Sequence, residues 1–117
     1  MYFVIFGTDK PGMEAVRTAT RPAHRDYLRS PGKHAITVRV GGPTLRDDGA
    51  TMNGTLLIVE AETIDAVRAF AADDPYSRAG LFQTILYVSA AISLLSIVLA
   101  SLVREQPLRG RVVPPKA

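Results

Sequence analysis

The side chains best suited to chemistry in this 117-residue chain are its two histidines, His24 and His34, together with its carboxylates. Histidine gains and loses a proton near neutral pH, so it suits general acid–base catalysis. The chain has no cysteine, which excludes disulfides and thiolate chemistry. Neither Ser30 nor Ser77 lies in a recognisable nucleophile elbow. The residue types therefore favour proton transfer over covalent acyl chemistry.

No motif indicates a metal or a cofactor. The two histidines are far apart in the sequence and have no third ligand at a zinc-like spacing. The Asp47-Asp48-Gly49 segment is typical of a turn, since a Ca²⁺ loop needs more oxygen ligands over 12 residues. No glycine-rich phosphate loop is present. We therefore expect neither a cofactor nor a metal, and we expect His34, in a loop bounded by Gly and Pro, at the plain surface.

The net charge does not predict a nucleic-acid partner. The formal charge is +3, but ten Lys and Arg balance ten Asp and Glu up to Val103, so the excess lies in the tail that begins at Arg104. A nucleic-acid module needs basic residues along one face, with aromatic residues between them. We therefore expect no nucleic-acid partner. The missing cysteines, and the absence of a basic leader after Met1, favour a cytoplasmic protein without a signal peptide.

Hydrophobic alternation and turn residues predict the order of elements along the first 80 residues. The expected order is strand 2–6, helix 13–29, strand 35–40, strand 55–59, a helix capped by Thr63, and a short extra turn over residues 74–80. Pro22 cannot donate a backbone hydrogen bond, so we expect the first helix to break or restart there, with Thr20 as a candidate cap.

This β-α-β-β-α order needs only one more strand to complete a ferredoxin-like βαββαβ unit, which is an α+β fold. Two helices on one face of an antiparallel sheet leave the other face bare. In a chain this short, a second copy of the same chain is the simplest cover. The predicted fold therefore also predicts a homodimer.

Three stretches resemble motifs of the YCII family, over residues 1 to about 82. They are Arg21-Pro-Ala-His24 followed by Tyr27-Leu28, the glycine-rich hairpin of residues 42–61, and the segment 71–82 with its Asp-Pro-Tyr and Ala-Gly-Leu-Phe runs. The resemblance implies a dimeric α/β barrel with a His and an Asp paired in a cleft, which map by motif position to His24 and Asp74. It also implies small-molecule chemistry, such as dehydrochlorination of a chlorinated hydroquinone, without a fixed cofactor.

Two hypotheses for function follow. In the first, the protein is a lyase or hydrolase without a covalent nucleophile, in which His24 is the general base and Asp74 orients it. Tyr76 and Arg21 would then bind the substrate, with Arg21 steering an anion. In the second, the domain binds a small ligand or a partner without catalysis. Asp74 directly before Pro75 is then a helix cap, and His24 is a half-buried, hydrogen-bonded side chain.

The resemblance ends after Phe82. Residues 85–103 form an uncharged run that is long enough for a transmembrane candidate. One hypothesis is a fourth strand at residues 81–88 followed by an added apolar helix. A second is a membrane anchor formed by residues 85–103 with a basic flank. A third is a terminus derived from a shifted reading frame. We divide the chain into a YCII-like domain (1–88), an apolar helix (89–105) and a basic tail (106–117).

Overall fold

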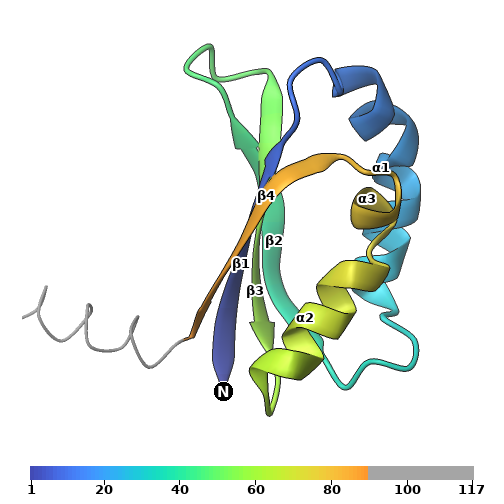
Figure 1. Ribbon diagram of the computed structural model, residues 1–117, viewed down its shortest axis with the longest axis vertical. Helices are drawn as coiled ribbons and strands as arrows, with labels where there is room; N and C mark the ends of the chain where they lie inside the picture. The colour runs from blue at the N-terminus through green and yellow to red at the C-terminus, as the bar shows by residue number, and fades with distance from the viewer. Residues whose placement is uncertain (90–117) are drawn as a thin grey trace, which may run out of the picture.

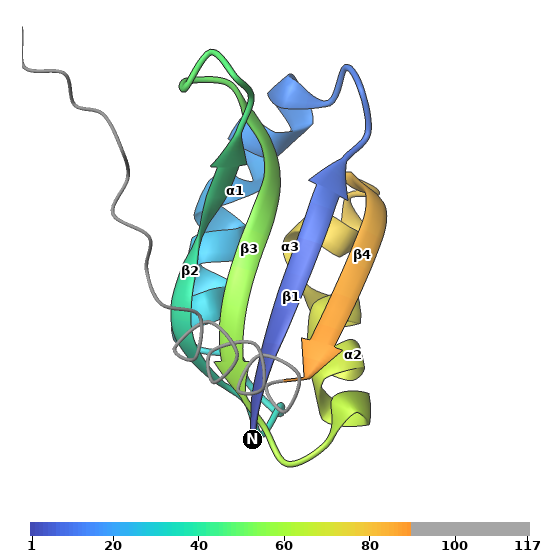
Figure 2. The ribbon, with the colours of Figure 1, turned by 90° about the vertical axis from the view of Figure 1, so that its left-hand side faces the viewer.

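Four strands and three helices make up residues 1–89, the part of the chain that the computed structural model describes (Figure 1). The elements are β1 (Tyr2–Asp9), α1 (Glu14–Arg29), β2 (Thr37–Leu45), β3 (Met52–Glu60), α2 (Ile64–Asp73), α3 (Pro75–Arg78) and β4 (Phe82–Ser89). The strands form one sheet in the order β2-β3-β1-β4, with every neighbouring pair antiparallel (Figure 2). The predicted α+β fold, a ferredoxin-like βαββαβ unit, is therefore confirmed.

The last strand, β4, completes the sheet that the sequence left open. It pairs antiparallel with β1, from Phe3 opposite Ser89 to Asp9 opposite Phe82. Ile85 packs against the core from this strand. The hypothesis of a fourth strand near residues 81–88 is therefore correct, and β1 is protected on both sides instead of presenting an open edge.

The predicted apolar helix (89–105), from residue 90 onward, and the basic tail (106–117) lie outside the described residues. Residues 85–89 belong to β4. Within residues 1–89, no helix is both long enough and apolar enough to cross a membrane.

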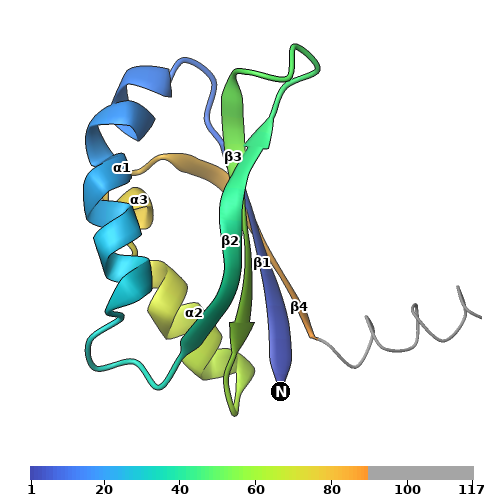
Figure 3. The ribbon, with the colours of Figure 1, turned by 180° about the vertical axis from the view of Figure 1, so that it is seen from behind.

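The core lies between the sheet and the helices, which all cover the same face of the sheet (Figures 1 and 3). Alternate residues of the central strands point into it, among them Phe3 on β1 and Val59 on β3. From α2, Val67 and Phe70 are completely buried against them. Each such side chain contributes about 1.5–3 kcal/mol through removal of apolar surface from water. Thr63 caps α2 as predicted, since its hydroxyl accepts the backbone N–H of Ala66.

The predicted break at Pro22 is wrong, because α1 runs without interruption from Glu14 to Arg29. Pro22 and Thr18 are both exposed, so water can bond the Thr18 carbonyl that Pro22 leaves without a donor. Arg17 and His24, two turns apart on the buried face, hold the helix to the domain on either side of the proline. These contacts outweigh the missing hydrogen bond.

The outer face of the sheet, opposite the helices, carries two rows of apolar side chains across the strands. One row joins Leu56, Phe6 and Leu86. The second row consists of Val40, Ile58, Val4 and Val88. Several of these side chains are exposed, with Leu86 at 53% and Val40 at 57%. No element within residues 1–89 covers this face (Figure 1).

Candidate active site

His24 and Asp74 form a buried hydrogen-bonded pair between α1 and the junction of α2 with α3. The Nδ1–H of His24 donates to Oδ1 of Asp74 at 2.7 Å, because an ionised carboxylate can only accept. The two residues are 5% and 4% exposed. The bond sets the imidazole tautomer and leaves the lone pair on Nε2, which has no hydrogen-bond partner within residues 1–89.

Asp74 has a second role as the helix cap that the sequence suggested. Its Oδ1 also accepts the backbone N–H of Tyr76 at 2.9 Å, which caps α3, and Pro75 occupies the first turn. This capping hydrogen bond fixes the position of the carboxylate independently of its bond to His24. One oxygen atom, Oδ1 of Asp74, therefore both caps α3 and orients His24.

Tyr76 forms a flat stack with the histidine. The two rings are 3.9 Å apart between centroids and inclined by 20°. Tyr76 is 1% exposed, and the edge of Phe82 packs against it at 5.9 Å. Burial raises the pKa of Tyr76, while the positive charges of Arg17 and Arg21 act in the opposite direction. The phenol is therefore protonated at neutral pH and can donate a hydrogen bond.

Arg17 is a site residue that the sequence analysis missed. It is 3% exposed, and its Nε and Nη2 atoms bond both carboxylate oxygens of Asp9 at 2.6 and 2.8 Å. Nη2 also donates to Thr55 at 2.9 Å, and the guanidinium lies 4.6 Å from the centroid of the Tyr76 ring. Burial disfavours the charge, but the ion pair with Asp9 outweighs it and raises the pKa of Arg17 above its usual value. Its position seven residues before His24, on the same helical face, was the available signal.

A cavity of about 300 Å³ opens beside the stacked rings. This size lies at the lower end of the range for small-molecule sites. One wall comes from α1 and the facing wall from the Gly41-Gly42-Pro43 segment of β2. The lining residues are Arg17, Arg21, His24, Arg25, Leu28, Arg29, Gly41, Gly42, Pro43, Thr55 and Tyr76.

The structure thus brings the four residues singled out from the sequence to one place. His24, Asp74 and Tyr76 are in direct contact, and Arg21 lines the same cavity. Within residues 1–89, no group of three or more His, Cys, Asp or Glu side chains could hold a metal ion. The arrangement offers one accessible imidazole nitrogen backed by a carboxylate, which is suited to accepting a proton.

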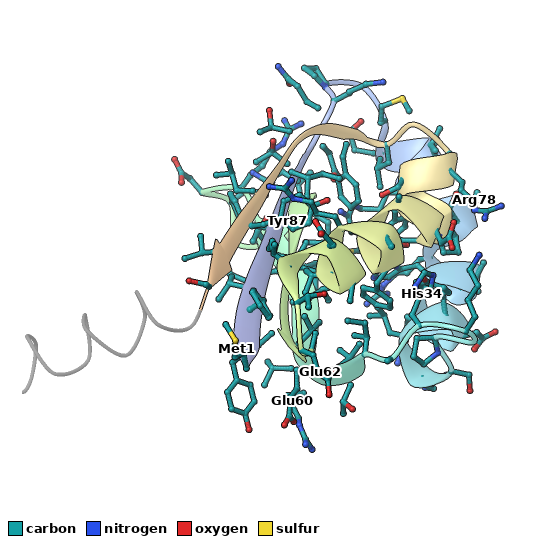
Figure 4. All side chains as sticks on the ribbon, turned by 60° about the horizontal axis from the view of Figure 1, so that its bottom comes forward. Met1, His34, Glu60, Glu62, Arg78 and Tyr87 are labelled. Atoms are coloured by element: carbon teal, nitrogen blue, oxygen red, sulfur yellow. The ribbon has the colours of Figure 1, made fainter. Side chains whose placement is uncertain are left out.

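His34 does not lie free at the surface, so that prediction is wrong. Its side chain is 9% exposed, and its Nε2 lies 2.8 Å from Oδ2 of Asp73. Figure 4 shows His34 and Arg78 on the side of the domain where the helices lie. Arg78 bonds the other oxygen of this carboxylate at 3.0 Å, and Lys33 lies 3.6 Å away. Two adjacent aspartates lie at the end of α2, and the first of them, Asp73, pairs with the histidine of the loop that follows α1.

Comparisons with known proteins indicate a family. A family model for the YCII-related domain matches residues 1–89. An uncharacterized protein of Haemophilus influenzae is 29% identical over an alignment of 90 residues, and the match covers 74% of this chain and 92% of that protein. Protein YciI of Escherichia coli O6:H1 is 31% identical over an alignment of 87 residues, and the match covers 71% of this chain and 89% of YciI.

Among solved structures, the chain is similar to 5-chloro-2-hydroxyhydroquinone dehydrochlorinase (TftG) from Burkholderia phenoliruptrix AC1100, in complex with 2,5-dihydroxybenzoquinone. The TM-score is 0.65 and the sequence identity is 40%. The match covers 76% of this chain and 92% of the other.

Proposed function

The chain belongs to the YCII-related domain family, and we propose that it is a small-molecule lyase in which His24 is the general base and Asp74 orients it. The observation that carries the proposal is the pairing of a buried carboxylate, which accepts two hydrogen bonds, with an imidazole whose second nitrogen opens onto a cavity. A histidine held in this way has a fixed tautomer, and its positive charge after protonation is stabilised by the carboxylate.

The proposed step is an elimination. Nε2 of His24 takes the proton of a ring hydroxyl in the keto tautomer of the substrate, in which the carbon that bears the leaving group also carries a hydrogen. The electron pair of the O–H bond forms a C=O double bond, the adjacent ring double bond shifts towards the carbon that bears the leaving group, and the leaving group departs with its own bonding pair as an anion such as chloride. Asp74 faces the imidazolium that results, and Tyr76 keeps the ring in plane by stacking. No covalent bond to the protein is needed, and none of the cavity-lining residues is a serine or cysteine.

The similar dehydrochlorinase supports elimination over hydrolysis. It is a lyase by name, it is 40% identical, and its structure holds a single-ring dihydroxybenzoquinone. A cavity of about 300 Å³ suits a ligand of that size. We therefore propose a hydroxylated, halogenated six-membered ring as the substrate class.

The test is chloride release from 5-chloro-2-hydroxyhydroquinone by the full chain and by two matched variants. His24→Ala should lower the rate by at least about 10²-fold, because general base catalysis contributes about 10²–10⁴-fold. His34→Ala removes the other histidine and should leave the rate within about threefold. Chloride release that survives in a folded His24→Ala variant would end the assignment, as would a wild-type chain that releases none.

We also propose that the protein is a homodimer that pairs the outer faces of two sheets. The two apolar rows on this face support it, because exposed apolar patches of this kind mark association sites. Leu86→Glu should convert dimer to monomer in sedimentation equilibrium. Leu45→Glu changes an exposed leucine outside the two rows and should leave the mass unchanged. A monomeric wild-type chain would contradict the proposal.

The division of the chain into a domain (1–88), an apolar segment (89–105) and a basic tail (106–117) also stays a proposal, as does a cytoplasmic location. The uncharged run of residues 85–103 supports a membrane tether as the alternative location. Fractionation of cells that express the full chain separates the two. Recovery in the supernatant without detergent would exclude the tether.

A further inference from the structure

Four arginines follow one another at intervals of four residues on α1 and all line the cavity. They are Arg17, Arg21, Arg25 and Arg29. Residues spaced by four lie next to each other on a helix, and like charges at this spacing destabilise it. The row therefore costs stability unless negative charge lies close by.

Negative charge is supplied at the two ends of the row but not in the middle. Arg17 is paired with Asp9 at 2.6 Å, and Arg29 with Asp26 at 3.3 Å. Within residues 1–89, neither Arg21 nor Arg25 has a carboxylate within ion-pair distance. The middle of the row therefore keeps two positive charges.

The rest of the cavity does not neutralise them. Within residues 1–89, no aspartate or glutamate lines the cavity. Asp74 lies behind His24 and is committed to Nδ1 of the imidazole and to the α3 cap. The facing wall is the uncharged Gly41-Gly42-Pro43 segment, where Gly42 leaves open space because a Cβ there would meet nothing within 4 Å. A cleft lined by charge of one sign concentrates ligands of the opposite sign.

The positive charges also lie beside the reactive groups. Arg21, His24 and Tyr76 line the same cavity, and Tyr76 stacks directly on the His24 ring. A negative group held by Arg21 would thus share that cavity with the imidazole of His24. Guanidinium groups bind carboxylates and similar oxyanions through forked hydrogen bonds.

We infer that the cavity binds its ligand as an anion, with a negatively charged oxygen on a planar ring held by Arg21 and Arg25. This inference rests on the proposed function, since it assigns the charge of the ligand of that same site. Arg21 is half-buried and Arg25 is exposed, so Arg21 contributes more to binding. The charged oxygen belongs to a ring carboxylate or to an acidic ring hydroxyl.

Calorimetric titration of the full chain with two pairs of ligands tests the inference. Each pair differs in charge but not in ring size: benzoate against benzamide, and 2,5-dihydroxybenzoquinone, whose ring hydroxyls are acidic, against hydroquinone. At least one anion should bind about tenfold or more tightly than its neutral partner. A preference within the first pair alone assigns a carboxylate, and one within the second pair alone assigns an ionised hydroxyl.

Variants identify the residues responsible. Arg21→Gln should weaken binding of the preferred anion about tenfold and Arg25→Gln about threefold, while binding of the neutral partner is unchanged. Arg68→Gln, on α2, removes the same charge from a side chain that lies over Tyr87 and should change neither. Equal affinities within both ligand pairs would overturn the inference, and so would equal losses for anion and neutral ligand in Arg21→Gln.

The His24→Ala variant separates this inference from the proposed reaction. It should lose chloride release and keep the preference for the anion, because the arginines remain. If His24→Ala retains chloride release while the anion preference persists, the proposed reaction fails and the inferred binding mode stands. If chloride release is lost as expected but no anion preference exists in the wild-type chain, only the binding mode fails.

Discussion

Two His–Asp pairs, His24–Asp74 and His34–Asp73, use adjacent aspartates at the end of α2. They consist of the same residue types but differ in burial, in the bonded imidazole nitrogen and in their other partners. Asp73 and Asp74 are adjacent, and each is bonded to a histidine from α1 or the loop after it. Asp74 is buried, bonds His24 through Nδ1, and leaves Nε2 without a hydrogen-bond partner within residues 1–89, on a ring that lines the cavity. Asp73 is 28% exposed and is shared by His34, Lys33 and Arg78.

The difference shows why a residue pair alone does not define a site. His34 uses its Nε2 for Asp73, and its ring packs edge-on against Tyr27 and Phe70. It does not line the cavity, so no substrate there could reach it. The carboxylate of Asp73 is already neutralised by two cations, whereas that of Asp74 accepts, within residues 1–89, only the ring N–H of His24 and the backbone N–H of Tyr76. The second pair is a structural link between the α1–β2 loop and the end of α2.

The largest expected difference between the pairs is in catalysis. Asp74→Asn should lower the rate of chloride release by about 10²-fold or more, since a carboxamide neither fixes the tautomer nor stabilises the imidazolium. Asp73→Asn makes the same chemical change one residue earlier and should leave the rate within about threefold. Steady-state kinetics of both folded variants checks this, and equal losses would remove the distinction.

A smaller difference is expected in stability. Asp74→Ala removes a buried hydrogen bond to His24 and the cap of α3 together, so the free energy of unfolding should fall by about 2–3 kcal/mol. Asp73→Ala should cost less, because two of its three partners, Lys33 and Arg78, are exposed and remain solvated when it is removed. Urea unfolding at pH 7 measures both. A larger loss of unfolding free energy for Asp73→Ala than for Asp74→Ala would contradict this prediction.

The smallest expected effect is a pH dependence of stability that comes from Asp73 in the His34–Asp73 pair. Hydrogen bonds from His34 and Arg78 lower the pKa of Asp73 from 3.8 to about 2. Because the folded pKa is the lower one, the stability that Asp73 contributes is fully present above about pH 4 and is lost as the pH falls towards 2. The wild-type chain should therefore lose more stability than Asp73→Asn over this range in thermal unfolding. Parallel curves for the two proteins would contradict the lowered pKa.

Much of the fold could be predicted from the sequence because its signals are local. Thr63 precedes an apolar helical face, and the turn at Asp48 and Gly49 uses side-chain and left-handed backbone chemistry that three or four residues specify. The helix across Pro22 could not be predicted in this way. What maintains it is tertiary, namely the contacts of Arg17 and His24 with distant segments.

The residues of the site likewise divide into those that local sequence predicts and those that depend on the fold. His24 and Asp74 could be named because they lie within motifs that resemble a family, and Asp74 has a local signature as a cap before Pro75. Arg17 and the His34–Asp73 pair depend on which segments meet in space, across separations of 8 and 39 residues. Opposite charges at such separations are common in any sequence, so only the folded arrangement distinguishes these pairs.

The central claim is that Asp74 holds the proton on Nδ1 of His24 and thereby presents a basic Nε2 to the cavity. Nitrogen-15 NMR of the two histidine rings, recorded at a pH where both are neutral, measures this directly. We predict that neutral His24 carries its proton on Nδ1, and that in Asp74→Asn this preference is lost. A neutral His24 with its proton on Nε2 in the wild-type chain would contradict the proposed role of Asp74, because Nε2 could then accept no proton.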